Sequence, residues 1–265
     1  NLHASSFRFP RTRDFRSILD ILLFLAMAKN RSNTHVSINY TERPFGVPSS
    51  VQDSTKINKI LEESFNYQKK FSVSNACGFV NVILKHCFEA AGIDIKIVYG
   101  TMEVLGYRHP HVWLEIQGHN VDNTYVEDIP EENFIQIKKT TTYSSTVDES
   151  TDLFLGDQFT NALGIATHSI TEFKWFLQNQ NKVLVMYKNR ICLTRYYQSL
   201  VKMMKDEFGV VVSDVPNTKC WACGKEDEEI KKCTRCKFAL YCSRKCQRSD
   251  WKQIHKKMCL PPNMY

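Results

Sequence analysis

Residues 220–259 read CWACGKEDEEIKKCTRCKFALYCSRKCQRSDWKQIHKKMC, and the cysteine spacing in this stretch is the strongest structural signal in the chain. Pairs of cysteines two or three residues apart turn two sulfurs toward one metal ion, and two such pairs complete a tetrahedral zinc site. The eight predicted ligands are Cys220, Cys223, Cys233, Cys236, Cys242, Cys246, His255 and Cys259. We therefore predict two closed sites and two Zn²⁺ ions as cofactors.

Disulfide bonds are the alternative to zinc, because about 40 residues with few large apolar side chains need cross-links to fold. An odd number of thiols, seven, and a histidine at ligand spacing both favour zinc. The chain also offers no clear secretion signal: the apolar run 17–28 follows several arginines, but Asp20 interrupts it and it is too short to span a bilayer. We expect a cytoplasmic and/or nuclear protein without membrane insertion.

The basic charge of the chain lies almost entirely in the same stretch. The 265 residues carry a formal net charge of +7, and residues 220–259 hold 11 lysines and arginines against 5 acidic residues, or +6. Seven zinc-bound thiolates and two Zn²⁺ ions lower these values by 3, to about +3 for the stretch and about +4 for the chain. Since a major-groove reading pattern is also missing from the sequence, we do not expect direct nucleic-acid binding.

Residues 220–259 resemble the MYND-type zinc finger, through Tyr241-Cys242, Cys246-Gln247, Asp250-Trp251 and the ending His255-x3-Cys259. The resemblance implies interleaved sites, with Cys220, Cys223, Cys242 and Cys246 on one zinc and Cys233, Cys236, His255 and Cys259 on the other. It also implies a protein-interaction module for short proline-containing peptides, with Gln247 and Trp251 as candidate contacts. The alternative for Trp251 is that it packs the small core of the finger.

Upstream of the finger, apolar residues at helical spacing predict two helices. The first starts at Asp53 or Ser54 and continues through residue 65. The second has apolar residues at helical spacing over 80–91, with Ser74 or Asn75 as its N-cap and Gly92 at its end. Cys77 then falls in the first turn of this second helix.

Strand patterns follow the second helix and complete a predicted α+β fold. Alternating residues predict a strand over 93–99 that ends at Gly100. Segments 111–116 and 120–125 flank Gln117-Gly118-His119, which predicts an antiparallel hairpin with a turn of two or three residues.

The pattern divides the chain into five parts. We predict a tail over 1–50, a folded domain over 51–168, a helical connector over 169–209, a linker over 210–219 and the finger over 220–259. A capping box formed by Ser169 and Glu172 opens the connector. Because the chain begins at Asn1, Met27 is an alternative start of the natural protein.

A cysteine nucleophile needs a thiolate, a base and a group that orients the base. A helix N-terminus favours a thiolate at Cys77, His111 is a candidate base, and Asp122 is its candidate partner. If the hairpin turn has two residues, Ile116 pairs with His119, and Asp122 lies on the same face as His111. A three-residue turn would move Asp122 to the opposite face.

These residues resemble the transglutaminase-like superfamily, through Cys77 at a helix start, Ala91-Gly92-Ile93, His111-Val-Trp113-Leu-Glu115 and Asp122-Asn-Thr124. The resemblance implies a papain-like domain in which the helix carrying Cys77 packs on the sheet carrying His111 and Asp122. It implies acyl transfer from an amide through a Cys77 thioester, with the Cys77 backbone N–H and Asn75 as oxyanion candidates. The sequence departs from the family at Gly78, where Trp or Arg is frequent, and in its short hairpin.

Two functional hypotheses therefore remain open. The first is a thiol enzyme, a hydrolase or acyltransferase, whose finger recruits a substrate or partner. The second is a non-enzymatic adaptor in which the finger binds peptides and the first domain is inactive. Cys77 could also be a small core residue, as we expect for Cys87 and Cys192. Arylamine acetyltransferases, which use a similar triad, offer a weaker resemblance through Cys77 and Asn81.

Overall fold

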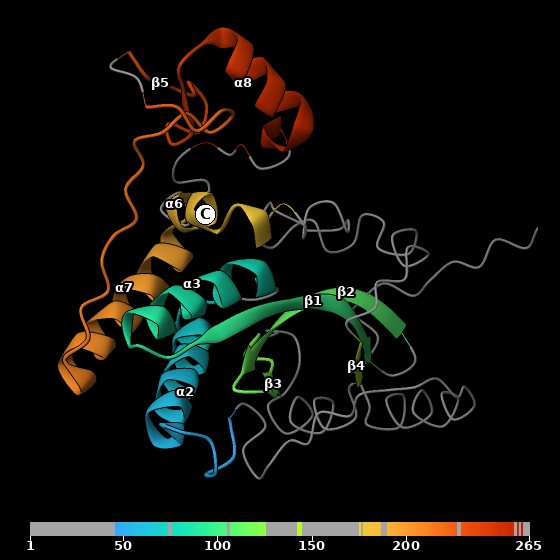
Figure 1. Ribbon diagram of the computed structural model, residues 1–265, viewed down its shortest axis with the longest axis vertical. Helices are drawn as coiled ribbons and strands as arrows, with labels where there is room; N and C mark the ends of the chain where they lie inside the picture. The colour runs from blue at the N-terminus through green and yellow to red at the C-terminus, as the bar shows by residue number, and fades with distance from the viewer. Residues whose placement is uncertain are drawn as a thin grey trace, which may run out of the picture.

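The computed structural model describes residues 46–73, 76–104, 107–125, 142–144, 175, 177–186, 190–226, 229–256, 259 and 261. Within them, a body of helices and an antiparallel sheet carries a small cysteine-rich finger at one end (Figure 1). The predicted capping box at Ser169 and Glu172, the oxyanion candidate Asn75 and most of the predicted tail lie outside the described residues. Among the described residues, no helix is long and apolar enough to cross a membrane.

Two helices open the body. α2 spans Ser54–Lys70 and buries one apolar stripe, which confirms the first predicted helix and extends it beyond residue 65. α3 spans Cys77–Ala90, so Cys77 is its first residue. The prediction that Ser74 or Asn75 is the N-cap is wrong, because the N-cap is Ala76. Because α3 begins at Cys77, the cap position falls on Ala76 and not on either polar residue.

The sheet has the strand order β3-β2-β1-β4, with every pair antiparallel. Its strands are β1 Ile95–Val104, β2 Tyr107–Ile116, β3 His119–Val121 and β4 Thr142–Ser144. The prediction that Gly100 ends a strand is wrong: β1 continues because Gly100 pairs with His111 of β2. β2 also begins earlier than predicted. Pairing with a long neighbour outweighs the weak strand preference of glycine.

The hairpin between β2 and β3 has a two-residue turn, the first of the two predicted lengths. Gln117 and Gly118 adopt φ values of 48° and 83°, and Ile116 pairs with His119. Gly118 meets this requirement without strain. Gln117 does not have that freedom, but its amide exchanges two 3.2 Å hydrogen bonds with the backbone of Gln52. The turn is therefore tied to the segment before α2, and the register is fixed.

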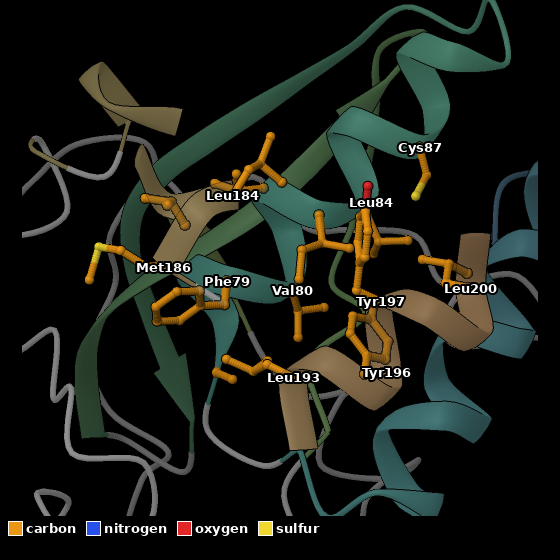
Figure 2. Packing of buried hydrophobic residues seen from close by; sticks show 14 of the residues in the cluster. Phe79, Val80, Leu84, Cys87, Leu184, Met186, Leu193, Tyr196, Tyr197 and Leu200 are labelled. Carbon is orange, nitrogen blue, oxygen red and sulfur yellow. The ribbon is translucent and has the colours of Figure 1, made fainter. Parts of the chain in front are cut away.

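The core lies where α3 meets the sheet and two later helices. α3 packs on β1 and β2, α6 (Gln180–Met186) packs on α3, and α7 (Ile191–Phe208) packs on α2 and α3. Figure 2 shows this layer, with Phe79, Val80, Leu84 and Cys87 from α3, Leu184 and Met186 from α6, and Leu193, Tyr196, Tyr197 and Leu200 from α7. The helices of the predicted connector thus contribute to the core. Cys87 is fully buried, as expected of a core cysteine.

After α7 the chain runs along the side of the body to the finger (Figure 1). Val212 is buried, and His86 contacts the carbonyl of Ser213 at 2.8 Å. The finger contains β5 Lys231–Lys232, β6 Leu240–Tyr241, α8 Arg244–Asp250 and a π-helical turn, η3 Trp251–His255. Lys182 of α6 donates a 2.6 Å hydrogen bond to the carbonyl of Trp221. The finger is therefore packed on the body as well as joined to it.

Candidate functional sites: two metal centres and a cysteine–histidine–aspartate cluster

The finger brings its eight sulfur and nitrogen ligands into two groups. In each group the ligand atoms all lie within 4.8 Å of one another, and the groups are Cys220, Cys223, Cys242 and Cys246, then Cys233, Cys236, His255 and Cys259. The first pair of each group comes from one knuckle of the chain, and the second pair comes from a later one. The sites are interleaved in sequence, so each metal ion would join two distant segments.

The spacing of the ligand atoms fits zinc. Two sulfurs bound tetrahedrally at about 2.3 Å from Zn²⁺ lie about 3.8 Å apart, and a sulfur and a nitrogen lie about 3.6 Å apart. Sulfur–sulfur distances are 3.7 Å for Cys223–Cys242, 3.6 Å for Cys242–Cys246 and 3.7 Å for Cys233–Cys259. His255 Nε2 lies 3.4 Å from Cys233 Sγ and 3.8 Å from Cys236 Sγ. These separations are far beyond a disulfide bond, so two Zn²⁺ ions fit the finger.

The second metal group has a buried support around its histidine. The rings of Trp221, Tyr241 and Trp251 surround His255, with centroid distances of 6.0, 5.9 and 5.7 Å. Asp250 accepts a 2.5 Å hydrogen bond from Tyr241 and lies 4.0 Å from His255 Nδ1. The Nε2 atom of His255 thereby faces the cysteine sulfurs and is available to a metal ion.

The candidate peptide contacts are Gln247, in the middle of α8, and Trp251, the first residue of η3. Both side chains are half-buried. The ring centroid of Trp251 lies 5.7 Å from that of His255, and the side chain packs against the core while it stays partly exposed. This position is compatible with a peptide contact and with core packing at the same time.

The second candidate site lies where the start of α3 meets β2. His111 Nε2 lies 3.1 Å from Asp122 Oδ2, and the side chain of Cys77 also hydrogen-bonds to His111. Asp122 is fully buried and His111 nearly so, whereas Cys77 is half-buried. Thr124 donates its backbone N–H to Asp122 Oδ1 at 3.1 Å. The structure thus brings together all three residues that the sequence singled out.

Opposing effects determine the protonation of His111. Burial lowers its pKa, but the Asp122 charge and hydrogen bonds from Asp122 and Cys77 outweigh burial and raise the pKa to about 9. The ring also stacks on Trp113, with centroids 6.5 Å apart. Cys87 has no such neighbours, and burial alone raises the pKa of its thiol to about 12. The two cysteines of α3 are therefore chemically different.

Asn81 links the two elements of this site. Its side-chain N–H₂ donates to the carbonyl of Cys77 at 2.9 Å and to the carbonyl of Val112 at 2.8 Å, from one end of α3 to the middle of β2. The sequence pointed to Asn81 only through a weak family likeness. Its spacing of one helical turn from Cys77 was the available signal.

The geometry of the finger defines a small module held by two zinc sites. Residues 220–259 match the MYND finger family, so this part of the chain is a zinc-binding MYND finger, a protein-interaction module. The finger is similar to "Ubiquitin carboxyl-terminal hydrolase 19" of Arabidopsis thaliana, 51% identical over 18% of this chain and 7% of that protein. It is also similar to human "Histone-lysine N-methyltransferase SMYD1", 42% identical over 19% of this chain and 10% of that protein. Bovine "N-lysine methyltransferase SMYD2" is 48% identical over 16% of this chain and 10% of that protein.

The chain thus spans about a tenth or less of the length of these relatives. No solved structure matches the chain. The comparisons therefore bear on the finger, and the body is understood from its own residues.

Proposed function

We propose that the body is a transglutaminase-like, papain-like domain that transfers acyl groups through Cys77, and that the finger recruits its substrate or a partner. The contact of His111 with Asp122 at 3.1 Å, together with its hydrogen bond to Cys77, carries this proposal. A base held between a carboxylate and a thiol is the arrangement that activates a cysteine nucleophile. The position of Cys77 as the first residue of α3 adds the favourable end of a helix dipole.

The proposed reaction proceeds in two steps. The thiolate of Cys77, whose proton His111 already holds, attacks an amide carbonyl carbon, and the C–N bond breaks as protonated His111 gives its proton to the leaving amine. Water or a second amine then attacks the thioester, gives its proton to His111, and releases the Cys77 thiolate. Asp122 binds Nε2 of His111, so Nδ1 is the nitrogen available to the sulfur. The backbone N–H of Cys77 and the side chain of Asn75 are the proposed oxyanion donors.

The recruiting role is proposed for the finger. Its ligands would hold two zinc ions, and Gln247 and Trp251 would contact a short proline-containing peptide. Pro-rich segments bind aromatic surfaces at low entropic cost because they are already extended. We place the protein in the cytoplasm and/or the nucleus, where thiols stay reduced and zinc-bound. The proposed domains are a transglutaminase-like domain over 51–168 and the finger over 220–259. Between them lie the connector 169–209, whose helices α6 and α7 complete the core of the body, and the linker 210–219.

The test measures the reactivity of Cys77 in the folded, zinc-loaded chain. Iodoacetamide is applied between pH 5 and 9, and the modified sites are mapped by mass spectrometry. A triad cysteine labels fast near neutral pH, whereas Cys87, buried on the same helix, serves as the internal control. Cys77→Ala abolishes the fast phase.

An inert Cys77 in fully zinc-loaded protein would favour the second candidate function, a non-enzymatic adaptor. The observation behind the adaptor is that the family match covers the finger, residues 220–259, which is a protein-interaction module. In that case the body serves as a scaffold that presents the finger.

A further inference from the structure

Asn123, the residue after Asp122, is locked into the body by its side chain. Its Oδ1 atom accepts hydrogen bonds from Ser64 Oγ at 2.7 Å and from Gln68 Nε2 at 3.0 Å. Its Nδ2 atom donates to the carbonyl of Leu61 at 2.9 Å. Asn123 is fully buried, and all three partners belong to α2. Packing alone would be served as well by an apolar side chain of the same shape, so this set of bonds is specific.

The side chain of Gln68 also binds the backbone of residues 123–125. Its Nε2 atom donates to the carbonyl of Asn123 at 2.7 Å, and its Oε1 atom accepts from the backbone N–H of Tyr125 at 3.1 Å. Tyr196 of α7 extends the network, with its hydroxyl 2.8 Å from Ser64 Oγ. Gln68, Ser64 and Tyr196 are each fully buried. α2 therefore holds residues 123–125 through five hydrogen bonds, and α7 supports α2 through Tyr196.

The hydrogen bonds of the sheet do not fix the position of Asp122. β3 ends at Val121, which pairs with Leu114, so Asp122 lies one residue beyond the last ladder position. The carboxylate must still reach His111 of β2 at 3.1 Å. Its other oxygen accepts from the backbone of Thr124, which follows Asn123 directly. The orientation of Asp122 thus depends on the backbone of the segment that α2 holds.

We infer that Asn123 and Gln68 are positioning residues, which hold the Asp122 carboxylate against His111 from α2. This inference rests on the proposed function for its catalytic meaning, but the geometry it concerns can be measured without a substrate. Without the two amides, the segment after β3 would be free to move, and the carboxylate would lose its fixed distance to the imidazole. A carboxylate within about 4–6 Å raises a histidine pKa by about 1–3 units, so a displaced Asp122 changes the titration of His111.

The experiment titrates His111 by NMR in the full, zinc-loaded chain. Asp122 and Cys77 are the titratable groups that act on His111 in the described structure. Asn123→Ala removes the whole side-chain anchor. Gln68→Met removes the second anchor and leaves Asn123 bonded to Leu61 and Ser64. Val183→Ala, which trims a buried side chain of α6 outside the network, is the matched control for lost stability.

We expect the pKa of His111 to fall by about one unit or more in Asn123→Ala and in Gln68→Met, and to stay at the wild-type value in Val183→Ala. The rate of Cys77 labelling near neutral pH should fall in the same two variants. If either folded variant keeps the wild-type His111 pKa, the positioning role is overturned. An inert Cys77 in the wild type together with the expected pKa shifts would overturn the proposed function and leave the positioning role standing.

Discussion

Replacing Asp122 by Asn should destabilise the fold, and the loss of stability should be larger at pH 6.5 than at higher pH. In the wild type the pKa of His111 is raised from 6.5 to about 9 in the folded state. Because the folded pKa lies above the unfolded one, protonated His111 stabilises the fold fully below about pH 6.5, and this contribution is lost as the pH rises through 9. Each tenfold change in proton affinity is worth about 1.4 kcal/mol, so the contribution is about 3 kcal/mol.

Asp122→Asn keeps the shape of the side chain and removes its charge. Burial, which lowers the pKa of His111, then dominates, and the imidazole stays neutral above pH 6.5. The assay is urea denaturation at pH 6.5, 8 and 9.5 with zinc in excess, since the difference between the two proteins at each pH cancels contributions shared with the finger. We expect a gap of about 3 kcal/mol at pH 6.5 that shrinks as the pH rises.

The reasoning is refuted if the gap is independent of pH. A constant gap would mean that Asp122 acts through packing or neutral hydrogen bonds. An NMR titration of His111 in Asp122→Asn provides the direct check, with an apparent pKa below 6.5 as the expected value.

Four further outcomes are expected. Cys220→Ala should lower the zinc content from two ions to at most one, as measured by a chelator assay, and should disorder the finger; two retained ions would contradict the ligand grouping. Cys87 should stay unlabelled by iodoacetamide at pH 8 until urea unfolds the chain, because burial raises its pKa to about 12. Gly118→Val should cost about 1–2 kcal/mol in denaturant unfolding, since φ is 83° there; an unchanged midpoint would argue against the turn. Lys182→Met removes the hydrogen bond to the finger backbone, and amide exchange in the finger should quicken by about tenfold, corresponding to about 1.4 kcal/mol.

Local patterns predicted the parts of the structure that depend on neighbouring residues. The turn at Gln117-Gly118 fixed the hairpin register, and the register placed His111 and Asp122 within reach of each other. In the finger, cysteine spacing predicted the ligand pairs and two sites because each pair is a local feature, whereas the interleaved grouping came from the resemblance to the MYND-type finger. These features need no knowledge of the rest of the chain.

Features that depend on distant partners were missed. Gly100 continues a strand only because a long β2 pairs with it. The helix of Cys77 starts without the polar cap that the sequence offered nearby. The hydrogen bonds between Gln68 and Asn123 join residues 55 positions apart, and the periodicity of apolar residues in the sequence does not predict such a pair. The packing of α7 on α2 likewise could not be read from a segment that resembled a connector.

The attachment of the chain to the body at Val212 and Trp221 limits the positions that a partner bound to the finger can reach. A finger on a loose tether would give a captured peptide an effective concentration near Cys77 that depends on tether length. Here Val212 is buried and Lys182 fixes the backbone at Trp221, so the finger is held to one place on α6. Under the proposed function, a peptide bound by the finger enters the reaction at one separation and in one orientation. Selectivity among substrates would then depend on the length of substrate chain between the motif bound by the finger and the scissile amide.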